Sequence, residues 1–172
     1  MRNVAVKELM TPLDRYTTIA QDASLKDAFL LLEGAFRGEA KSDAAHPRDF
    51  AVLVVDQNRQ VIGRLVVWDV LRALEPQRVS RVDSLSMVDD YGVWSQPLIN
   101  LATKARYIQV KNIVQRLHGD EFINADASLD KAVHRLIAHR FLSLIVTERG
   151  RTAGVLRVVD VFSHICAIVR EA

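Results

Sequence analysis

The segment VIGRLVVWDVL, from Val61 to Leu71, contains an apolar strand pattern that runs through Gly63 and leads to Asp69. A second copy, AGVLRVVDVF, spans 153–162 near the other end of the chain. In both copies an aspartate follows the glycine by six positions, where the strand pattern changes to a helical one. Such a corner either holds a phosphorylated ligand at a helix N-terminus or is a well-capped helix.

The duplication extends over most of the chain. Asp22-Ala-Ser-Leu recurs as Asp126-Ala-Ser-Leu at an offset of 104 residues, whereas Gly63 recurs as Gly154 at an offset of 91. The first repeat therefore holds about 13 extra residues, which the turn-forming composition places in a polar loop at about 34–49. Repetition of this kind indicates two copies of one supersecondary unit.

Each repeat has the same predicted plan, β-α-β-β-α, which gives an α/β (α+β) fold. Ser24 and Ser128 are predicted to cap the first helix of each repeat, with Asp22 and Asp126 as competing candidates. The predicted strands include 51–56, 61–67, 142–148 and 153–159, and the closing helices are predicted at 70–75 and 161–170. The apolar faces of the first helices are predicted to contain Leu25, Ala28, Phe29, Leu32, Leu129, Val133, Leu136 and Ile137.

One such unit buries too little apolar surface to fold alone, so we expect the two repeats to share an interface. The predicted organisation is a first repeat at 1–75, a connector at 76–106 and a second repeat at 107–172. Within the connector, Ser95-Gln-Pro97 is predicted to start a helix that continues through Leu101.

Composition excludes several classes of protein. The 23 basic and 21 acidic residues are scattered without a block of like charge, which argues against a nucleic-acid partner. No apolar run reaches 18 residues and no signal peptide is visible, so neither a membrane span nor secretion is expected. The single cysteine, Cys166, is expected to be a buried core thiol, and a cytoplasmic location fits this cysteine usage.

The sequence shows no constellation of catalytic or metal-ligating residues. The five histidines lack the i, i+4 spacing of a helical metal site, and nucleophile-elbow and Walker-type motifs are absent. We therefore expect a non-catalytic protein with no metal site and no required cofactor.

The order of the motifs resembles the cystathionine-β-synthase (CBS) domain, which occurs in tandem as the Bateman module. The matching segments are Val6-Lys-Glu-Leu-Met-Thr-Pro12, the two Asp-Ala-Ser-Leu segments, Leu53-Val-Val-Asp56 and the two Gly…Asp corners. The resemblance implies repeats related by pseudo-two-fold symmetry with a connector helix between them. It also implies a regulatory homodimer that binds AMP, ADP, ATP or S-adenosylmethionine in clefts between the repeats.

In the family, the corner aspartate holds the ribose hydroxyls, and a Thr or Ser three residues after the glycine holds phosphate. That hydroxyl position is Val66 in the first repeat and Arg157 in the second. Val66 cannot replace the hydroxyl, so the first cleft should disfavour phosphate there, whereas the guanidinium of Arg157 either binds phosphate bidentately or points to solvent. The second corner (Gly154, Arg157, Asp160) is therefore predicted to be the stronger anion site. The first corner (Gly63, Asp69) is predicted to take a nucleoside-like or apolar ligand, or none. The alternative for both corners is that Asp69 and Asp160 serve only as helix caps.

The resemblance also places two extended segments beside the adenine. These contribute Thr18, Ile19 and Ala20 from the first repeat and Phe122, Ile123 and Asn124 from the second. Phe122 is assigned either to stacking on a base or to the core. Trp68 and Trp94 are assigned either to the core or to a dimer or partner surface. Two hypotheses remain: a metabolite sensor that acts through its dimer or an unidentified protein partner, and a ligand-free scaffold of the same fold.

Overall fold

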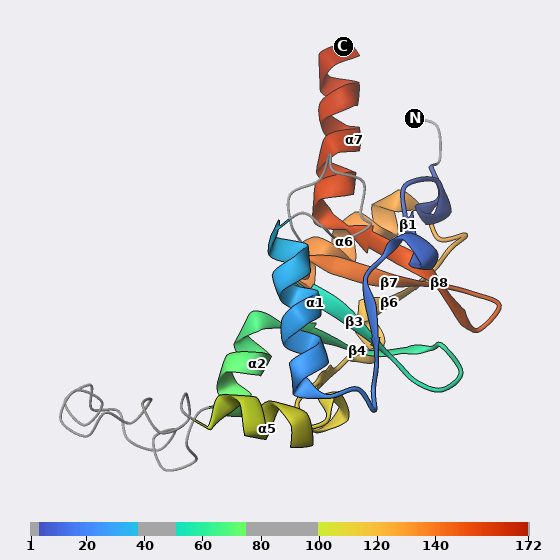
Figure 1. Cartoon of the computed structure of the whole chain (residues 1–172). Coiled ribbons are helices and arrows are strands. Elements are labelled where there is room, and N and C mark those ends of the chain that lie inside the picture. The colour runs from blue at the N-terminus through green and yellow to red at the C-terminus, as the bar shows by residue number, and fades with distance from the viewer. Residues whose placement is uncertain (1–3, 38–50, 75–99, 172) are drawn as a thin grey trace.

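The computed structural model describes residues 4–37, 51–74 and 100–171 of the 172-residue chain (Figure 1). These residues form two four-stranded sheets, with strand orders β2-β3-β4-β5 and β1-β8-β7-β6. The strands are β1 (Thr11–Pro12), β2 (Thr18–Ala20), β3 (Ala51–Val55), β4 (Val61–Val66), β5 (Gln115–Arg116), β6 (Phe122–Asn124), β7 (Ser143–Glu148) and β8 (Arg151–Arg157). The helices are α1 (Leu25–Arg37), α2 (Val67–Leu74), α5 (Leu101–Tyr107), α6 (Leu129–His139) and α7 (Val158–Glu171), with short 3₁₀ turns at η1 (Val6–Glu8), η2 (Leu13–Arg15), η3 (Val110–Asn112) and η4 (Gly119–Glu121).

The two sheets confirm the predicted α+β class and the pair of repeats. In each sheet a parallel pair (β2 with β3, β6 with β7) is followed by an antiparallel hairpin (β3 with β4, β7 with β8). The parallel strands are joined by α1 in the first repeat and α6 in the second, as a crossover connection requires.

Each sheet takes its last strand from the other repeat. The edge strand β5 pairs with β4, and β1 pairs with β8. The segments that lead into these strands cross over as well, because the Val6 amide donates to the Ala127 carbonyl at 2.9 Å and the Val110 amide donates to the Ala23 carbonyl at 2.9 Å. This exchange places residues of both repeats at each strand-to-helix corner.

The first helix of each repeat begins as predicted. The Ser128 hydroxyl accepts from the Lys131 amide at 3.3 Å, and the Ser24 hydroxyl accepts from the Asp27 amide at 3.2 Å. In return the Asp27 carboxylate accepts from the Ser24 amide and hydroxyl, which lowers the pKa of Asp27. These bonds satisfy amide groups that would otherwise lack a partner at the helix start.

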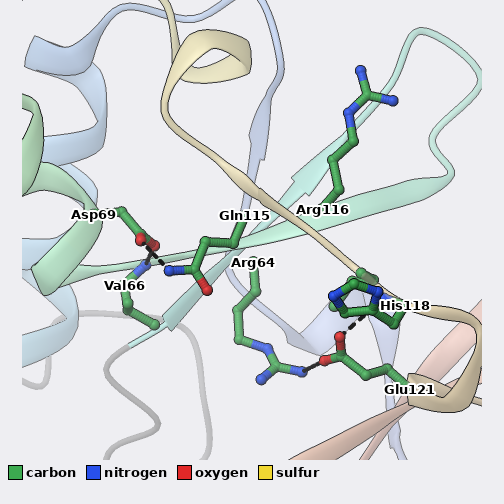
Figure 2. A pocket seen from close by; sticks show the side chains of 8 residues that line it. Arg64, Val66, Asp69, Gln115, Arg116, His118 and Glu121 are labelled. Carbon is green, nitrogen blue, oxygen red and sulfur yellow. Dashed lines mark hydrogen bonds and ion pairs between the residues drawn. The ribbon is translucent and has the colours of Figure 1, made fainter.

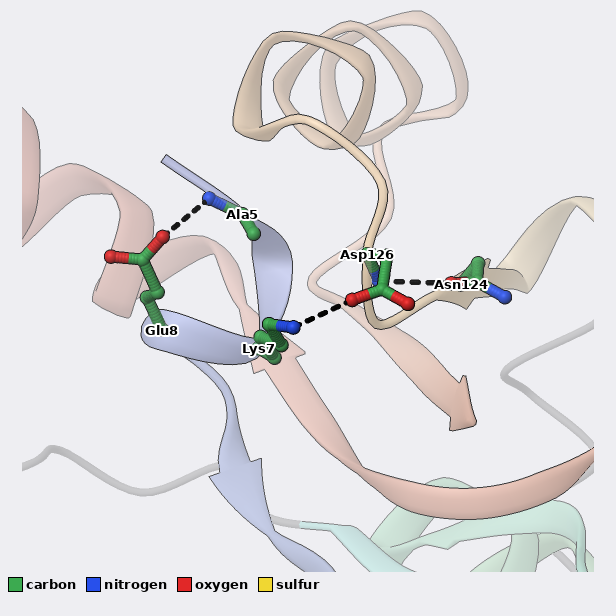
Figure 3. Close-up of polar contacts among 5 residues, drawn as sticks. All are labelled: Ala5, Lys7, Glu8, Asn124 and Asp126. Atoms are coloured by element: carbon green, nitrogen blue, oxygen red, sulfur yellow. Dashed lines mark hydrogen bonds and ion pairs between the residues drawn. The ribbon is translucent and has the colours of Figure 1, made fainter. Parts of the chain in front are cut away.

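The competing cap candidates instead bind the other repeat. Lys7 Nζ donates to Asp126 Oδ1 at 2.7 Å (Figure 3), and Lys111 Nζ donates to Asp22 Oδ1 at 2.9 Å. The first of these contacts raises the pKa of Lys7. The two ion pairs are related by the internal repeat and join each lead segment to the opposite Asp-Ala-Ser-Leu turn.

Three clusters of buried side chains lie among the described residues. One is centred on each repeat and includes a residue from the lead segment of the other, Val110 in the first and Val6 in the second, and a third joins the two sheets. The buried members of this third cluster are Leu53 and Val61 from the first repeat and Ile145 and Val155 from the second. The shared interface expected from the sequence therefore includes an apolar cluster between the sheets.

Several sequence-based predictions differ from the structure. Ile137 is exposed although it was assigned to the apolar face of its helix, and Cys166 on α7 is partly exposed rather than buried. Trp68 is 74% exposed, so the core assignment for this residue is wrong. Figure 1 shows why α7 leaves side chains uncovered: its C-terminal part projects beyond the sheets.

The connector and the insertion are described only in part. The helix α5 lies against α1 and contributes the buried Ala105 to the core of the first repeat. The predicted helix start at 95–97, most of the 34–49 insertion, Trp94 and His46 lie outside the described residues. Among the described residues, no helix is long and apolar enough to cross a membrane.

Candidate functional site

The first corner is the junction of β4 and α2. The helix begins at Val67, three residues earlier than predicted, so Asp69 is its third residue and Val66 precedes it. Asp69 is therefore not the N-cap residue that the sequence indicated. Its Oδ2 atom accepts from the Val66 amide at 2.9 Å, which is the returning half of a capping box.

The second oxygen of Asp69 bonds to the other repeat. Gln115 lies on β5, and its Nε2 atom donates to Asp69 Oδ1 at 2.8 Å. Asp69 is 4% exposed, so this carboxylate is buried and both of its oxygens accept a hydrogen bond. Both donors are neutral, and the negative charge of Asp69 is not cancelled by them.

The second corner, at β8 and α7, has the same backbone geometry and a different side-chain partner. Asp160 is the third residue of α7, and its Oδ2 atom accepts from the Arg157 amide at 3.3 Å. The Arg157 guanidinium also donates to Asp160, through Nε to Oδ2 at 2.8 Å and through Nη2 to Oδ1 at 2.6 Å. This is a bidentate ion pair between side chains that are each 9% exposed.

Neither interpretation of Arg157 from the sequence describes this arrangement. The solvent-directed alternative is wrong, because the residue is buried. A phosphate role stays a prediction, and it would require the guanidinium to leave Asp160. As it lies, Arg157 neutralises the carboxylate of its own corner.

The corner glycines are required by the strand that crosses them. A Cβ atom on Gly154 would lie 2.4 Å from the Thr11 carbonyl oxygen, and one on Gly63 would lie 2.7 Å from the Gln115 carbonyl oxygen. Both oxygens belong to the lead segment of the opposite repeat. The two glycines therefore permit close backbone approach of the exchanged strands.

A cavity of about 350 Å³ lies at the first corner (Figure 2). Asp69 and Gln115 line one part of it, and Arg64 and Glu121 line another. Its remaining lining residues are Val66, Arg116, Leu117 and His118. The wall therefore combines residues of β4 and α2 with residues of the second repeat from β5 to η4.

An ion pair between the repeats forms part of this wall. Arg64 Nη2 donates to Glu121 Oε2 at 2.8 Å, and the side chains are 20% and 10% exposed. The other Glu121 oxygen accepts from the His118 amide at 3.1 Å. Arg64 Nε is buried and has no hydrogen-bond partner among the described residues. An unmet buried donor costs about 1–3 kcal/mol.

The residues predicted to flank an adenine lie on β2 and β6, the strands that run parallel to the first strand of each hairpin. Ile19 and Ile123 are buried in the cores of their repeats. Phe122 packs against the cluster that joins the sheets, whereas Asn124 is exposed and accepts from the Asp126 amide (Figure 3). Thr18 and Ala20 pair with β3. The residues that line the cavity include Asp69 but none from β2 or β6.

Sequence reasoning missed Arg64, Gln115 and Glu121 as cavity residues. Arg64 directly follows the corner glycine, and the sequence gives no indication of its partner. Glu121 and Gln115 lie 57 and 46 residues from their partners, and local patterns do not reveal such pairs. No group of three or more metal-ligating side chains occurs in the described part of the chain.

Comparison with known proteins gives a consistent family assignment. The family model for the CBS domain matches residues 6–76 and 110–167, one match in each repeat. No curated protein sequence matches the chain.

Solved structures of low sequence identity share the fold. A CBS domain-containing protein of unknown function from Kribbella flavida has a TM-score of 0.69 at 17% identity, and the alignment covers 95% of this chain and 99% of that one. The CBS-pair protein CBSX2 from Arabidopsis thaliana has a TM-score of 0.65 at 20% identity, with 99% of both chains covered. A structure of CBSX2 in complex with AMP has a TM-score of 0.60 at 19% identity, with 95% of this chain and 97% of that one covered.

Proposed function

Because the chain belongs to the CBS-domain family and carries the domain twice, we propose that it is a non-catalytic regulatory module that binds an adenosine nucleotide beside Asp69. One observation carries this proposal: a cavity between the repeats contains a buried carboxylate with neutral donors and two arginines. S-adenosylmethionine is a second ligand of the same class. The AMP complex of CBSX2 supports the choice of an adenosine ligand.

The chemistry of the first corner suits a ribose. An ionised carboxylate offers about four acceptor sites, and among the described residues two are occupied, by the Val66 amide and by Gln115. Ribose hydroxyls can donate to the remaining ones. Arg64 and Arg116 in the same lining supply positive charge for a phosphate.

The cavity also explains how binding would act on the protein. Its wall is shared by the two repeats, so a bound ligand contacts both. Ligand binding then favours whichever arrangement of the repeats binds it better, and a dimer or a partner protein responds to that arrangement.

We expect AMP to raise the melting temperature of the protein. Ligand at 100 times its Kd stabilises the folded state by about 2.7 kcal/mol, which corresponds to about 5–10 °C for a chain of this size. A thermal-shift experiment with AMP, ADP, ATP and S-adenosylmethionine checks this. The proposal fails if all four leave the midpoint unchanged at millimolar concentration.

A ligand-free scaffold is the second candidate, and the second corner favours it. There Asp160 is satisfied by Arg157 without any ligand, and Asp69 already has a partner for each oxygen. A protein with this function would melt at one temperature whatever nucleotide is added.

In either case we propose that the chain forms a homodimer through exposed apolar helix faces. Val158, Phe162, Ile165 and Val169 recur at helical spacing on α7, and all four are exposed. Trp68 and Leu71 form a smaller exposed pair on α2. A symmetric dimer covers the same patch on both copies, which suits a face of this kind.

Charge on the α7 face is expected to separate the two copies. Phe162 is 66% exposed, so Phe162→Glu leaves the fold intact and places a carboxylate in the dimer contact. Light scattering after size exclusion should give about twice the chain mass of 19.3 kDa for the wild type and the chain mass for the variant. The control is Ser163→Glu, also exposed on α7 and outside the apolar stripe. A monomeric wild type contradicts the proposal.

A further inference from the structure

Two arginines precede the two corners, and their hydrogen bonding differs. Arg157 donates through both Nε and Nη2 to Asp160 of its own corner. Arg64 donates through Nη2 alone, to Glu121 of the other repeat, and its Nε has no acceptor among the described residues. Figure 2 shows this single contact in the cavity wall.

The difference makes Arg64 the less satisfied of the two. A guanidinium binds a carboxylate most strongly when two parallel N–H groups reach its two oxygens. The Arg157 pair has this geometry, whereas the Arg64 pair leaves a buried donor unmet, which opposes folding. An added acceptor that meets Arg64 Nε, once the side chain turns toward the cavity, would therefore gain more than one at Arg157.

Glu121 can release Arg64 without losing every partner. Its second oxygen accepts from the His118 amide at 3.1 Å, and that bond does not involve Arg64. This amide precedes η4, so the turn itself holds the carboxylate in place. Glu121 is an anion of the protein itself that holds the Arg64 guanidinium through one contact.

We propose that Arg64 is the phosphate-binding residue of the first cleft and that Glu121 is its built-in competitor. A phosphate group entering the cavity takes the two-point contact with Arg64 that Glu121 does not make. The Arg64–Glu121 pair joins β4 of one repeat to η4 of the other, so its exchange for a ligand contact removes a link between the repeats. This inference depends on the proposed function only for the location of the ligand, not for its adenosine part.

Competition predicts opposite effects for the two partners. The probe is inorganic pyrophosphate, titrated calorimetrically into the purified full chain. Glu121→Gln removes the competing charge and keeps the shape, so the affinity should rise about 10-fold. Arg64→Met removes the binding group, so the affinity should fall about 10-fold, as expected for loss of a hydrogen bond to a charged group.

A purely structural ion pair would behave differently, because both substitutions would then weaken binding or leave it unchanged. Either result for Glu121→Gln overturns the inference, as does the absence of pyrophosphate binding in both the wild type and Glu121→Gln. Glu148→Gln, which removes one exposed charge outside the cavity lining, is the matched control and should not change the affinity.

Arg64→Met leaves Glu121 buried beside an apolar side chain, and that variant can fail to fold. The double variant Arg64→Met/Glu121→Gln leaves no unpaired charge at this pair. It takes the place of Arg64→Met if the single variant does not fold. It should bind pyrophosphate as weakly as a protein without Arg64, and binding as tight as that of Glu121→Gln overturns the inference. Pyrophosphate affinity is predicted to be highest for Glu121→Gln, lower for the wild type and lowest for Arg64→Met. If that order is found and AMP does not bind, the adenosine proposal fails and the role of Arg64 stands.

Discussion

Replacing Arg157 by alanine is expected to lower the free energy of unfolding by about 3–5 kcal/mol, the cost of removing one partner of a buried ion pair. Asp160 would keep its bond to the amide of residue 157 and lose both guanidinium bonds. Its side chain is 9% exposed, so water cannot replace those bonds without local opening. Urea denaturation of the wild type and the variant measures the difference.

Two further variants show whether the loss comes from removing the charge partner of Asp160. Arg151→Ala removes an exposed arginine from the same strand, and its effect should stay within about 0.5 kcal/mol. The double variant Arg157→Met/Asp160→Leu replaces both charges by apolar groups and should recover most of the stability. A loss below about 1 kcal/mol for Arg157→Ala would mean that the pair does not close the second corner.

The two corners therefore differ in how readily a ligand can reach the aspartate. At the first corner, Asp69 is held by a neutral amide from Gln115, and a hydroxyl can take the place of that donor. At the second, a ligand would have to separate a buried bidentate ion pair. These contacts favour the first corner as the ligand site, whereas the sequence favours the second, and we therefore expect one ligand per chain.

Much of the fold could be predicted because the repeat is encoded locally. The serine caps at Ser24 and Ser128, the apolar runs of the hairpin strands and the two corners each depend on residues close together in the chain. The prediction that Asp69 stands at the N-cap position was wrong. The helix starts at Val67, and Asp69 accepts a hydrogen bond from the Val66 amide from within the first turn.

The composition of the candidate site could not be predicted, because it depends on the exchange of lead segments. The amide of Gln115 and the carboxylate of Glu121 reach the first corner only because β5 joins the sheet of the other repeat. Nothing in the local pattern around Arg64 indicates whether its partner is a ligand, solvent or a distant glutamate. The tandem arrangement was readable from the sequence, and the contacts between the repeats required the structure.

We propose that Asp69 holds an adenosine ligand in the first cleft. Asp69→Asn tests it, because asparagine has the same size and keeps an oxygen for the Val66 amide, but it lacks the charge that strengthens bonds from ribose hydroxyls. The affinity for AMP should fall about 10- to 100-fold, since a hydrogen bond to a charged group contributes about 1.5–3 kcal/mol. Glu148→Gln is again the control for the loss of one negative charge.

The most direct measurement is therefore calorimetric titration of AMP into the wild type and Asp69→Asn. We predict one AMP per chain for the wild type and a large loss of affinity for the variant. Equal affinity in the two proteins, two AMP molecules per chain or no binding to the wild type would rule out Asp69 as the residue that holds AMP.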